Sequence, residues 1–113
     1  MDERSVVTVF LRNGGEVLLL RRSDEVGSYR GSWGAVAGHA EGDPDAAVRT
    51  EISEETAIEP DRCELASRGE AFAVEDSDLD RRWIVHPFLL DCPTRSVTLD
   101  WEHTEAEWTS PTA

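Results

Sequence analysis

Residues 38–58 read Gly-His-Ala-Glu-Gly-Asp-Pro-Asp-Ala-Ala-Val-Arg-Thr-Glu-Ile-Ser-Glu-Glu-Thr-Ala-Ile, and this stretch decides the expected fold. Asp43 is a residue type that caps helices, and Pro44 suits the first helical position because no N–H is needed there. Pro60 marks a stop, since the residue before a proline disfavours the helical conformation. The pattern predicts a helix from Pro44 to about Thr56.

Three glutamates lie within this helix, at positions 51, 54 and 55. At 3.6 residues per turn, Glu54 and Glu55 lie on the same side as Glu51, within an arc of roughly 100°. Carboxylates so close repel one another unless a cation neutralises them. Mg²⁺ typically binds a few carboxylates together with substrate phosphates, so the cluster predicts a Mg²⁺ or Mn²⁺ site. The alternative is a solvated helix face, which is common in acidic chains.

The same residues resemble the signature of the Nudix (MutT-like) hydrolases. That signature is a Gly, five residues, a Glu, seven residues, and then Arg-Glu-aliphatic-x-Glu-Glu-x-Gly-aliphatic. Residues 51–58 reproduce the second half, with Ala57 in place of the last Gly and Thr50 in place of the Arg. Gly38 and Glu41 match the first half, but the segment between the halves is two residues shorter than usual.

Two departures from the signature bear on activity. The gap falls around residues 42–44, so Asp43 stands roughly where the family has its first signature glutamate. Thr50 lacks the charge of the family's Arg, which pairs with the signature glutamates and orients them. The neighbouring Arg49 projects ~100° away from Thr50 on a regular helix, so it could replace that Arg only in an irregular one.

The resemblance implies an α/β fold, the Nudix α/β/α sandwich around a mixed β-sheet, formed by a single domain over residues 1–113. Ser110 and Pro111 look like the start of the last helix of that fold, without the body of the helix. The sequence is therefore consistent with a domain that lacks its C-terminal helix or is a fragment of a longer chain. Some haloarchaeal chains that resemble this one continue into a translation-initiation-factor-2B-like domain.

Apolar and β-branched runs predict the strands of the sheet. A turn at residues 12–15 indicates a hairpin between the first two strands, and the polar residues 75–80 indicate a second, longer hairpin. The expected strands cover residues 5–11, 16–22, 33–40, 63–68, 70–74, 83–90 and 97–99.

For function, the resemblance implies a metal-dependent pyrophosphohydrolase that cleaves a nucleoside diphosphate linked to another group. An additional glutamate from a late loop often joins the helix carboxylates in the family. The expected metal ligands are Glu51, Glu54, Glu55, the Gly38 carbonyl and Glu102, and of these Glu51, Glu54 and Glu102 are also the expected catalytic groups.

The remaining site residues are open to two interpretations. Glu105 is the second choice after Glu102 for the late-loop glutamate. Arg21 and Arg22 end a strand and could bind a phosphate, although pairing with surface carboxylates is an equal alternative. Trp33 is a candidate for substrate contact, and core packing is the alternative for this residue type.

Three functional readings remain. The first is the hydrolase, whose partner is a nucleotide or another diphosphate small molecule. The second is a degenerate Nudix domain that binds a nucleotide or a protein partner, a second copy of the chain included, without hydrolysis. Such a domain could regulate a downstream domain. The third is a purely structural role. The helix carboxylates favour the first reading, while Thr50 and Ala57 favour the second.

The composition adds information on partners and solvent. All 11 basic residues are Arg, and 24 acidic residues bring the net charge to −13. This balance argues against nucleic acid as a partner, because binding to phosphate backbones needs a basic surface. An acidic chain without Lys resembles the proteins of extremely halophilic archaea, in which salt screens the repulsion. The alternative is an acidic mesophilic protein.

The sequence shows no long apolar run and no signal-like start, so we expect a cytoplasmic protein without membrane insertion. Cys63 and Cys92 are isolated in the sequence and lack metal-ligand spacing, and we expect two buried, reduced thiols rather than a disulfide. His39 and His103 are expected to be polar loop residues.

Overall fold

Two long strands form the centre of the sheet in the computed structural model, which describes residues 1–111. The strands β1 (Asp2–Asn13) and β7 (Arg81–Asp91) run parallel, with a register from Asp2 opposite Arg81 to Arg12 opposite Asp91. All other strand pairs are antiparallel, so the sheet is mixed.

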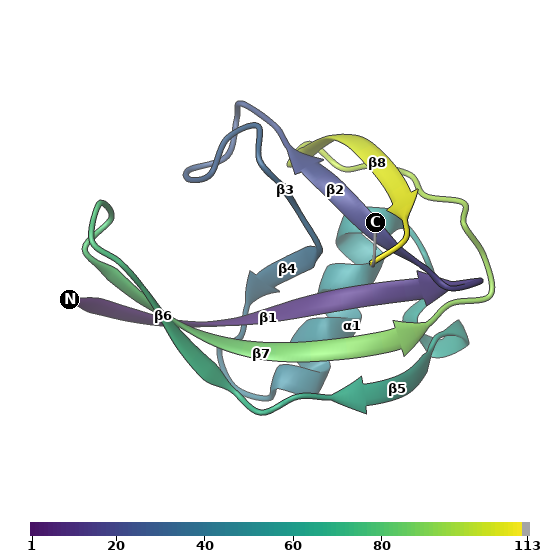
Figure 1. The fold of residues 1–113 in the computed structure, drawn as a ribbon, viewed down its shortest axis with the longest axis horizontal. Coiled ribbons are helices and arrows are strands. Elements are labelled where there is room, and N and C mark those ends of the chain that lie inside the picture. Colours follow the sequence, from purple (N-terminus) through teal and green to yellow (C-terminus); the bar gives the residue numbers. More distant parts are fainter. Residues whose placement is uncertain (112–113) are drawn as a thin grey trace.

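The remaining elements extend this centre on both sides (Figure 1). The strand order is β3-β2-β1-β7-β5, while β4 pairs with β1, β6 with β7 and β8 with β2. The bounds are β2 (Glu16–Arg22), β3 (Trp33–Gly34), β4 (Val36–His39), α1 (Pro44–Thr56), the 3-10 turn η1 (Pro60–Arg62), β5 (Glu64–Arg68), β6 (Phe72–Asp76) and β8 (His103–Thr109).

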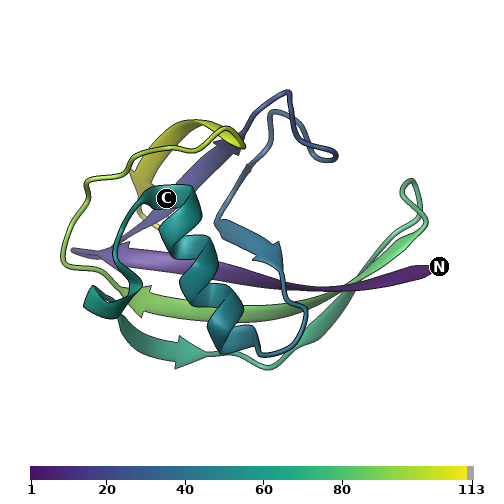
Figure 2. The ribbon, with the colours of Figure 1, turned by 180° about the vertical axis from the view of Figure 1, so that it is seen from behind.

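The helix α1 lies across one face of the sheet, as Figure 2 shows from behind. Asp43 caps it as predicted, because its carboxylate accepts a hydrogen bond from the Asp45 N–H at 3.1 Å. Val48 and Ile52 are buried and face the sheet. They pack in one core with apolar side chains of β1, β2, β4 and β7, including Val7, Val9, Leu11, Leu18, Leu20, Val36, Phe88 and Leu90.

The predicted helix and six of the seven predicted strand regions are confirmed, with shifts at their ends. The strand expected at residues 97–99 is wrong. Val97 and Leu99 pack against the core from an irregular segment, and the Thr98 N–H donates to the Thr56 carbonyl at 2.9 Å. The strand β8 follows instead. It pairs with β2, and its exposed residues Thr104, Glu105, Ala106 and Glu107 give no apolar alternation.

Within residues 1–111 no α-helix covers the other face of the sheet, so α1 forms the one helical layer of the described chain. Phe10, whose neighbours in β1 face α1, is 37% exposed on this second face. The last helix of the sandwich was expected to begin at Ser110, and its body falls outside the described residues. No helix of the described chain has the length and apolar character to span a membrane.

Candidate active site

Gly38 and Glu51 form the closest contact between the sheet and the acidic side of α1. A Cβ atom on Gly38 would lie 2.1 Å from both the Cδ and an Oε atom of Glu51. No side chain larger than hydrogen fits at this point of β4, because the Glu51 carboxyl lies directly on the backbone. The first glycine of the signature thus gives the helix carboxylate its place against the sheet.

At this contact Glu55 is buried and Glu51 is half-buried. Burial raises the pKa of Glu51 from 4.5 to about 7, with further contributions from the charges of Glu54 and Glu102. Burial also raises the pKa of Glu55, to about 9, and the charge of Glu51 adds to this effect. The Ala37 N–H donates to Glu55 Oε1 at 3.4 Å, which offsets part of the shift. Two carboxyl groups are therefore held close together where their charges are costly.

His103 lies on the other side of Glu55, at the start of β8. Its Nε2 is 3.5 Å from Glu55 Oε1, and its Nδ1 is 2.9 Å from Asp100 Oδ1. The His103 side chain is only 3% exposed. The expectation of a polar loop residue is therefore wrong, and His103 connects the carboxyl groups of Asp100 and Glu55. Nothing in the local sequence predicted this, because the contact depends on the register of β8 against β2.

Arginine does not neutralise the cluster. The arginine salt bridges of the described chain involve other carboxylates, such as Asp2, Asp45, Asp61, Asp91 and Glu105, and none reaches Glu51, Glu54, Glu55 or Glu102. Arg49, the possible substitute for the signature Arg, pairs with Asp61. A hard divalent cation fits this donor chemistry, which offers carboxylate oxygens and no opposite charge except a histidine.

The structure brings some of the expected metal ligands together more closely than others. Glu51 and Glu55 are adjacent, whereas Glu54 is exposed on the helix surface. Glu102 is half-buried, and its backbone carbonyl accepts a hydrogen bond from Ser23 N–H at 2.7 Å. Within residues 1–111, no three His, Cys, Asp or Glu side chains are arranged as a ready set of ligands. A bound cation would require Glu54 or Glu102 to turn toward the buried pair.

An apolar pocket of about 480 Å³ opens beside the carboxylates. Gly38, Glu102 and Arg22 line it at the border with the carboxylate cluster. Tyr29 and Trp83 form its aromatic side, with ring centroids 6.4 Å apart. The Trp83 Nε1–H donates to the Tyr29 hydroxyl, which in turn donates to Asp76 at 2.6 Å. The rest of the lining comes from Val6, Ser28, Ala37, His39, Val74 and Val85. This volume is in the range of pockets that bind small molecules.

The three candidates for substrate contact lie in different surroundings. Arg22 lines the pocket, and its Nε donates to the Ser28 carbonyl at 2.9 Å. Arg21 is exposed and pairs with Glu105 at 3.0 Å, which is the surface alternative. Trp33 is 44% exposed in β3 and does not belong to the core or to the lining of this pocket.

A second groove, of about 470 Å³, runs along the first turns of α1. Thr50 and Glu51 line it together with Glu41 and with Arg4 from β1. Arg4 is thus the arginine on the Thr50 side of the cluster, although its guanidinium pairs with Asp2 at 2.9 Å.

The mixed sheet, with one helix that carries buried carboxylates beside an aromatic pocket, defines an α/β domain of the Nudix type. The chain belongs to the NUDIX domain family, which matches residues 1–113. A search of curated proteins found no match. Among solved structures, a MutT protein from Methanosarcina mazei Go1 is similar with a TM-score of 0.83 and 28% identity over 96% of this chain and 78% of that one.

Two further structures show the same fold at lower identity. A MutT NUDIX hydrolase from Burkholderia pseudomallei has a TM-score of 0.77 and 20% identity, over 97% of this chain and 84% of that chain. The NUDIX domain of NrtR from Shewanella oneidensis, complexed with ADP ribose, has a TM-score of 0.74 and 16% identity, over 99% and 75%.

Sequence reasoning did not find the aromatic side of the pocket. Trp83 lines this pocket and is half-buried. Tyr29 was available as a signal, since it is the single aromatic residue of the polar loop 23–32 and the only tyrosine of the chain. A lone aromatic side chain in a polar loop often marks a contact surface.

Proposed function

We propose that this domain is a divalent-metal-dependent pyrophosphohydrolase that acts on a nucleoside diphosphate linked to another group. The observation that carries the proposal is the carboxyl pair of Glu55, which is buried, and Glu51, which is half-buried against Gly38; no arginine neutralises the pair. Two neighbouring acids held partly or fully away from water are costly for the free protein, so a selective advantage of the bound state explains them best.

The roles of the residues follow from their positions. Glu51 and Glu55 would hold the cation, with the Gly38 carbonyl and either Glu54 or Glu102 as additional oxygen ligands. A bound Mg²⁺ or Mn²⁺ supplies charge neutralisation for the diphosphate oxygens and lowers the pKa of water. Glu102 lines the pocket and would accept the proton of the attacking water. Arg22 also lines the pocket and would bind a phosphate oxygen.

The pocket supports a planar group at one end of the substrate. Tyr29 and Trp83 offer aromatic surface for stacking, and Val6, Val74 and Val85 offer apolar contact. A nucleoside in this pocket would bring its diphosphate to Arg22 and the carboxylates. The ADP ribose in the complex of the similar NrtR domain is a compound of this class.

A panel of nucleoside diphosphate derivatives, including ADP ribose and a dinucleoside tetraphosphate, tests the proposal in molar KCl with Mg²⁺ or Mn²⁺. We expect hydrolysis of at least one member, dependent on the metal. Glu51→Gln should lower turnover about a thousandfold, equivalent to roughly 4 kcal/mol. The exposed Glu70→Gln is the matched control with the same change of charge. Equal turnover of both variants would disprove the assignment of Glu51.

A second function, nucleotide binding without hydrolysis, is favoured by Thr50. Thr50 has no charge with which to pair a glutamate, and the adjacent Arg49 pairs with Asp61 instead of the cluster. Thr50→Arg restores a forked donor that can orient a glutamate, so a damaged hydrolase should gain turnover with little change in metal affinity. If wild type and variant both bind nucleotides but neither hydrolyses any of them, the domain is a binding or regulatory module.

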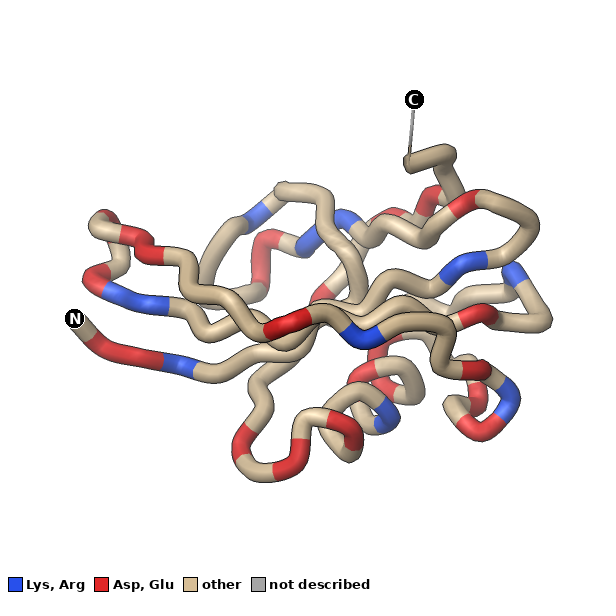
Figure 3. The backbone as a smooth tube through the Cα atoms, turned by 60° about the horizontal axis from the view of Figure 1, so that its bottom comes forward, with Lys and Arg blue, Asp and Glu red and all other residues tan. Residues whose placement is uncertain are grey.

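The acidic surface leads us to extend the proposal to a salt-rich cytoplasm. Asp and Glu are spread over the helix, the turns and the loops of the chain (Figure 3), and the net charge is −13. Salt at ~1 M shortens the Debye length to about 3 Å and so removes most of the repulsion. Melting temperature should therefore rise steeply from low to molar KCl. A flat profile would contradict a halophilic protein.

A further inference from the structure

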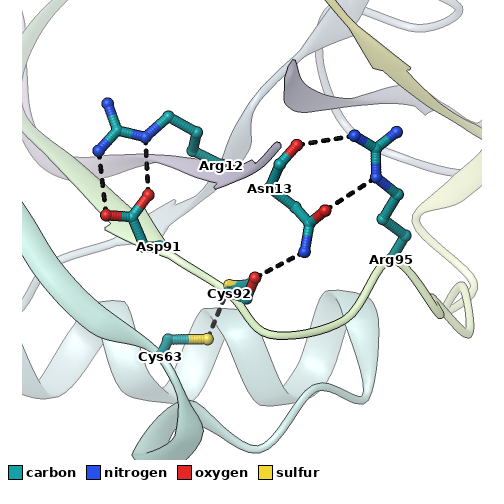
Figure 4. Close-up of polar contacts among 6 residues, drawn as sticks. All are labelled: Arg12, Asn13, Cys63, Asp91, Cys92 and Arg95. Carbon is teal, nitrogen blue, oxygen red and sulfur yellow. Dashed lines mark hydrogen bonds and ion pairs between the residues drawn. The ribbon is translucent and has the colours of Figure 1, made fainter. Parts of the chain in front are cut away.

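Cys63 and Cys92 lie opposite each other at one end of the strand pair β5–β7. The last pair in the register is Glu64 with Asp91, so Cys63 and Cys92 occupy the next opposed positions. Their Sγ atoms are 2.7 Å apart, and both cysteines are free (Figure 4). Both thiols are free in the structure, as the sequence predicted, and the fold brings the two into contact across 29 positions of sequence.

The backbone at this pair suits a covalent bond. The Cys63 N–H donates to the Pro60 carbonyl and the Cys92 N–H to the Arg12 carbonyl, so the two cysteines exchange no backbone hydrogen bonds. Opposed residues of this kind in antiparallel strands have Cα atoms about 4.5 Å apart. Disulfides require Cα separations of about 4.4–6.8 Å, so the bond would need little backbone movement.

The two thiols differ in access. Cys92 is 6% exposed, and burial raises the pKa of its thiol, with the contact to Cys63 adding to the effect. Cys63 is half-buried and follows the short turn η1. An external reagent therefore meets Cys63 first, and the buried Cys92 is positioned to complete the reaction.

We propose that Cys63 and Cys92 form a reversible intramolecular disulfide, with a small disulfide such as glutathione disulfide as the oxidant. The Cys63 thiolate attacks one sulfur of the oxidant, the oxidant's S–S bond breaks, and one glutathione leaves. Cys92 then gives its proton to solvent and attacks the Cys63 sulfur, which expels the second glutathione. Two protein thiols are oxidised, and one small disulfide is reduced to two thiols.

The bond would link the segment that follows α1 covalently to the end of β7. It closes a loop that contains β5, β6 and β7, and it also fixes the start of the segment that leads to Asp100, Glu102 and His103. Asn13 already holds this point, because its Nδ2 donates to the Cys92 carbonyl at 2.8 Å. A closed loop of this length should raise the melting temperature by about 10 °C. Neither cysteine lines the candidate active site, so metal binding should be retained.

The test is incubation of the whole protein with glutathione disulfide, followed by intact-mass analysis and thermal melting. We expect wild type to lose two hydrogen atoms, keep no glutathione, and melt about 10 °C higher until dithiothreitol reverses both changes. Cys92→Ser should retain one glutathione on Cys63, and Cys63→Ser should stay unmodified.

Three results would overturn the proposal. One is a wild-type protein that stays reduced while Cys92→Ser takes up glutathione. Another is a mixed disulfide that persists in wild type, and the third is a Cys63→Ser protein that reacts as fast as Cys92→Ser. All three readouts are independent of hydrolysis, so they distinguish this proposal from that of the active site.

Discussion

Two regions of the molecule treat charge in opposite ways. In the region shown in Figure 4, Arg12 pairs with Asp91 through two hydrogen bonds, and Arg95 donates to the side chain and the carbonyl of Asn13. At the candidate active site, Glu55 is buried and Glu51 is half-buried, and no arginine salt bridge of the described chain reaches either. Glu55 accepts from the Ala37 N–H and lies 3.5 Å from His103 Nε2, but no arginine offsets the charge of the two neighbouring carboxyl groups, which indicates a cationic ligand.

After the loss of the Glu51 carboxylate itself, the largest effect is expected from filling the space beside it. In Gly38→Ala the new Cβ would lie 2.1 Å from the Glu51 carboxyl, so Glu51 must move. A displacement near 1 Å should lower turnover about a hundredfold and weaken Mg²⁺ binding. Gly34→Ala is the control, because nothing lies within 4 Å of its added Cβ. Steady-state kinetics and calorimetry measure both, and unchanged values for Gly38→Ala would remove the role of this contact.

The second prediction concerns stability without metal. Burial raises the pKa of Glu55 to about 9 from 4.5, so the folded chain holds a proton that the unfolded chain releases. Stability should therefore fall as pH rises from about 4.5 towards 9, since this interval separates the two pKa values. Glu55→Gln removes the penalty and should stabilise the metal-free protein by about 2 kcal/mol near pH 8.

Melting curves in a chelator between pH 5 and 9 measure this effect. The variant should show its gain at high pH and none near pH 5, whereas the exposed Glu70→Gln should change little at any pH. A Glu55→Gln protein that is less stable than wild type at pH 8 would show that the carboxylate is satisfied within the fold.

In the region around Asn13, where polar groups are paired, removing a polar side chain should lower the stability of the protein instead of raising it. Asn13→Ala removes the donor to the Cys92 carbonyl and the acceptor for the Arg95 guanidinium, and should cost about 1–2 kcal/mol of unfolding free energy. Asn13→Asp keeps the acceptor for Arg95 but loses the donor to Cys92, so its unfolding free energy should fall between those of wild type and Asn13→Ala. Urea denaturation gives these values. A neutral Asn13→Ala would mean that water replaces the network without loss.

The reach of sequence reasoning follows the distance over which each feature is determined. Asp43 and Pro44 predicted the start of α1 because capping is local, and the Asp43 cap is confirmed. His103 beside Glu55 and Cys63 beside Cys92 could not be predicted, since both contacts depend on strand registers set by the whole sheet. The strand predicted at residues 97–99 is wrong because the apolar side chains of Val97 and Leu99 pack against the core equally well from an irregular segment.

The smallest effect is expected at the end of α1, where the signature has its last glycine. Ala57 has φ 61° and ψ 13°, a left-handed conformation, and its N–H donates to the Ser53 carbonyl at 3.1 Å. Alanine pays a steric penalty there that glycine avoids, while glycine is more flexible in the unfolded chain.

Ala57→Gly should therefore stabilise the protein by about 0.5–1 kcal/mol, with no change in turnover. Ala46→Gly, in the regular part of the same helix, makes the same chemical change and should destabilise by a similar amount. Opposite signs for these two variants in urea denaturation would show that Ala57 departs from the signature at a cost to the helix end alone. If Ala57→Gly also raised turnover, the end of α1 would have to control the position of Glu55, two residues earlier.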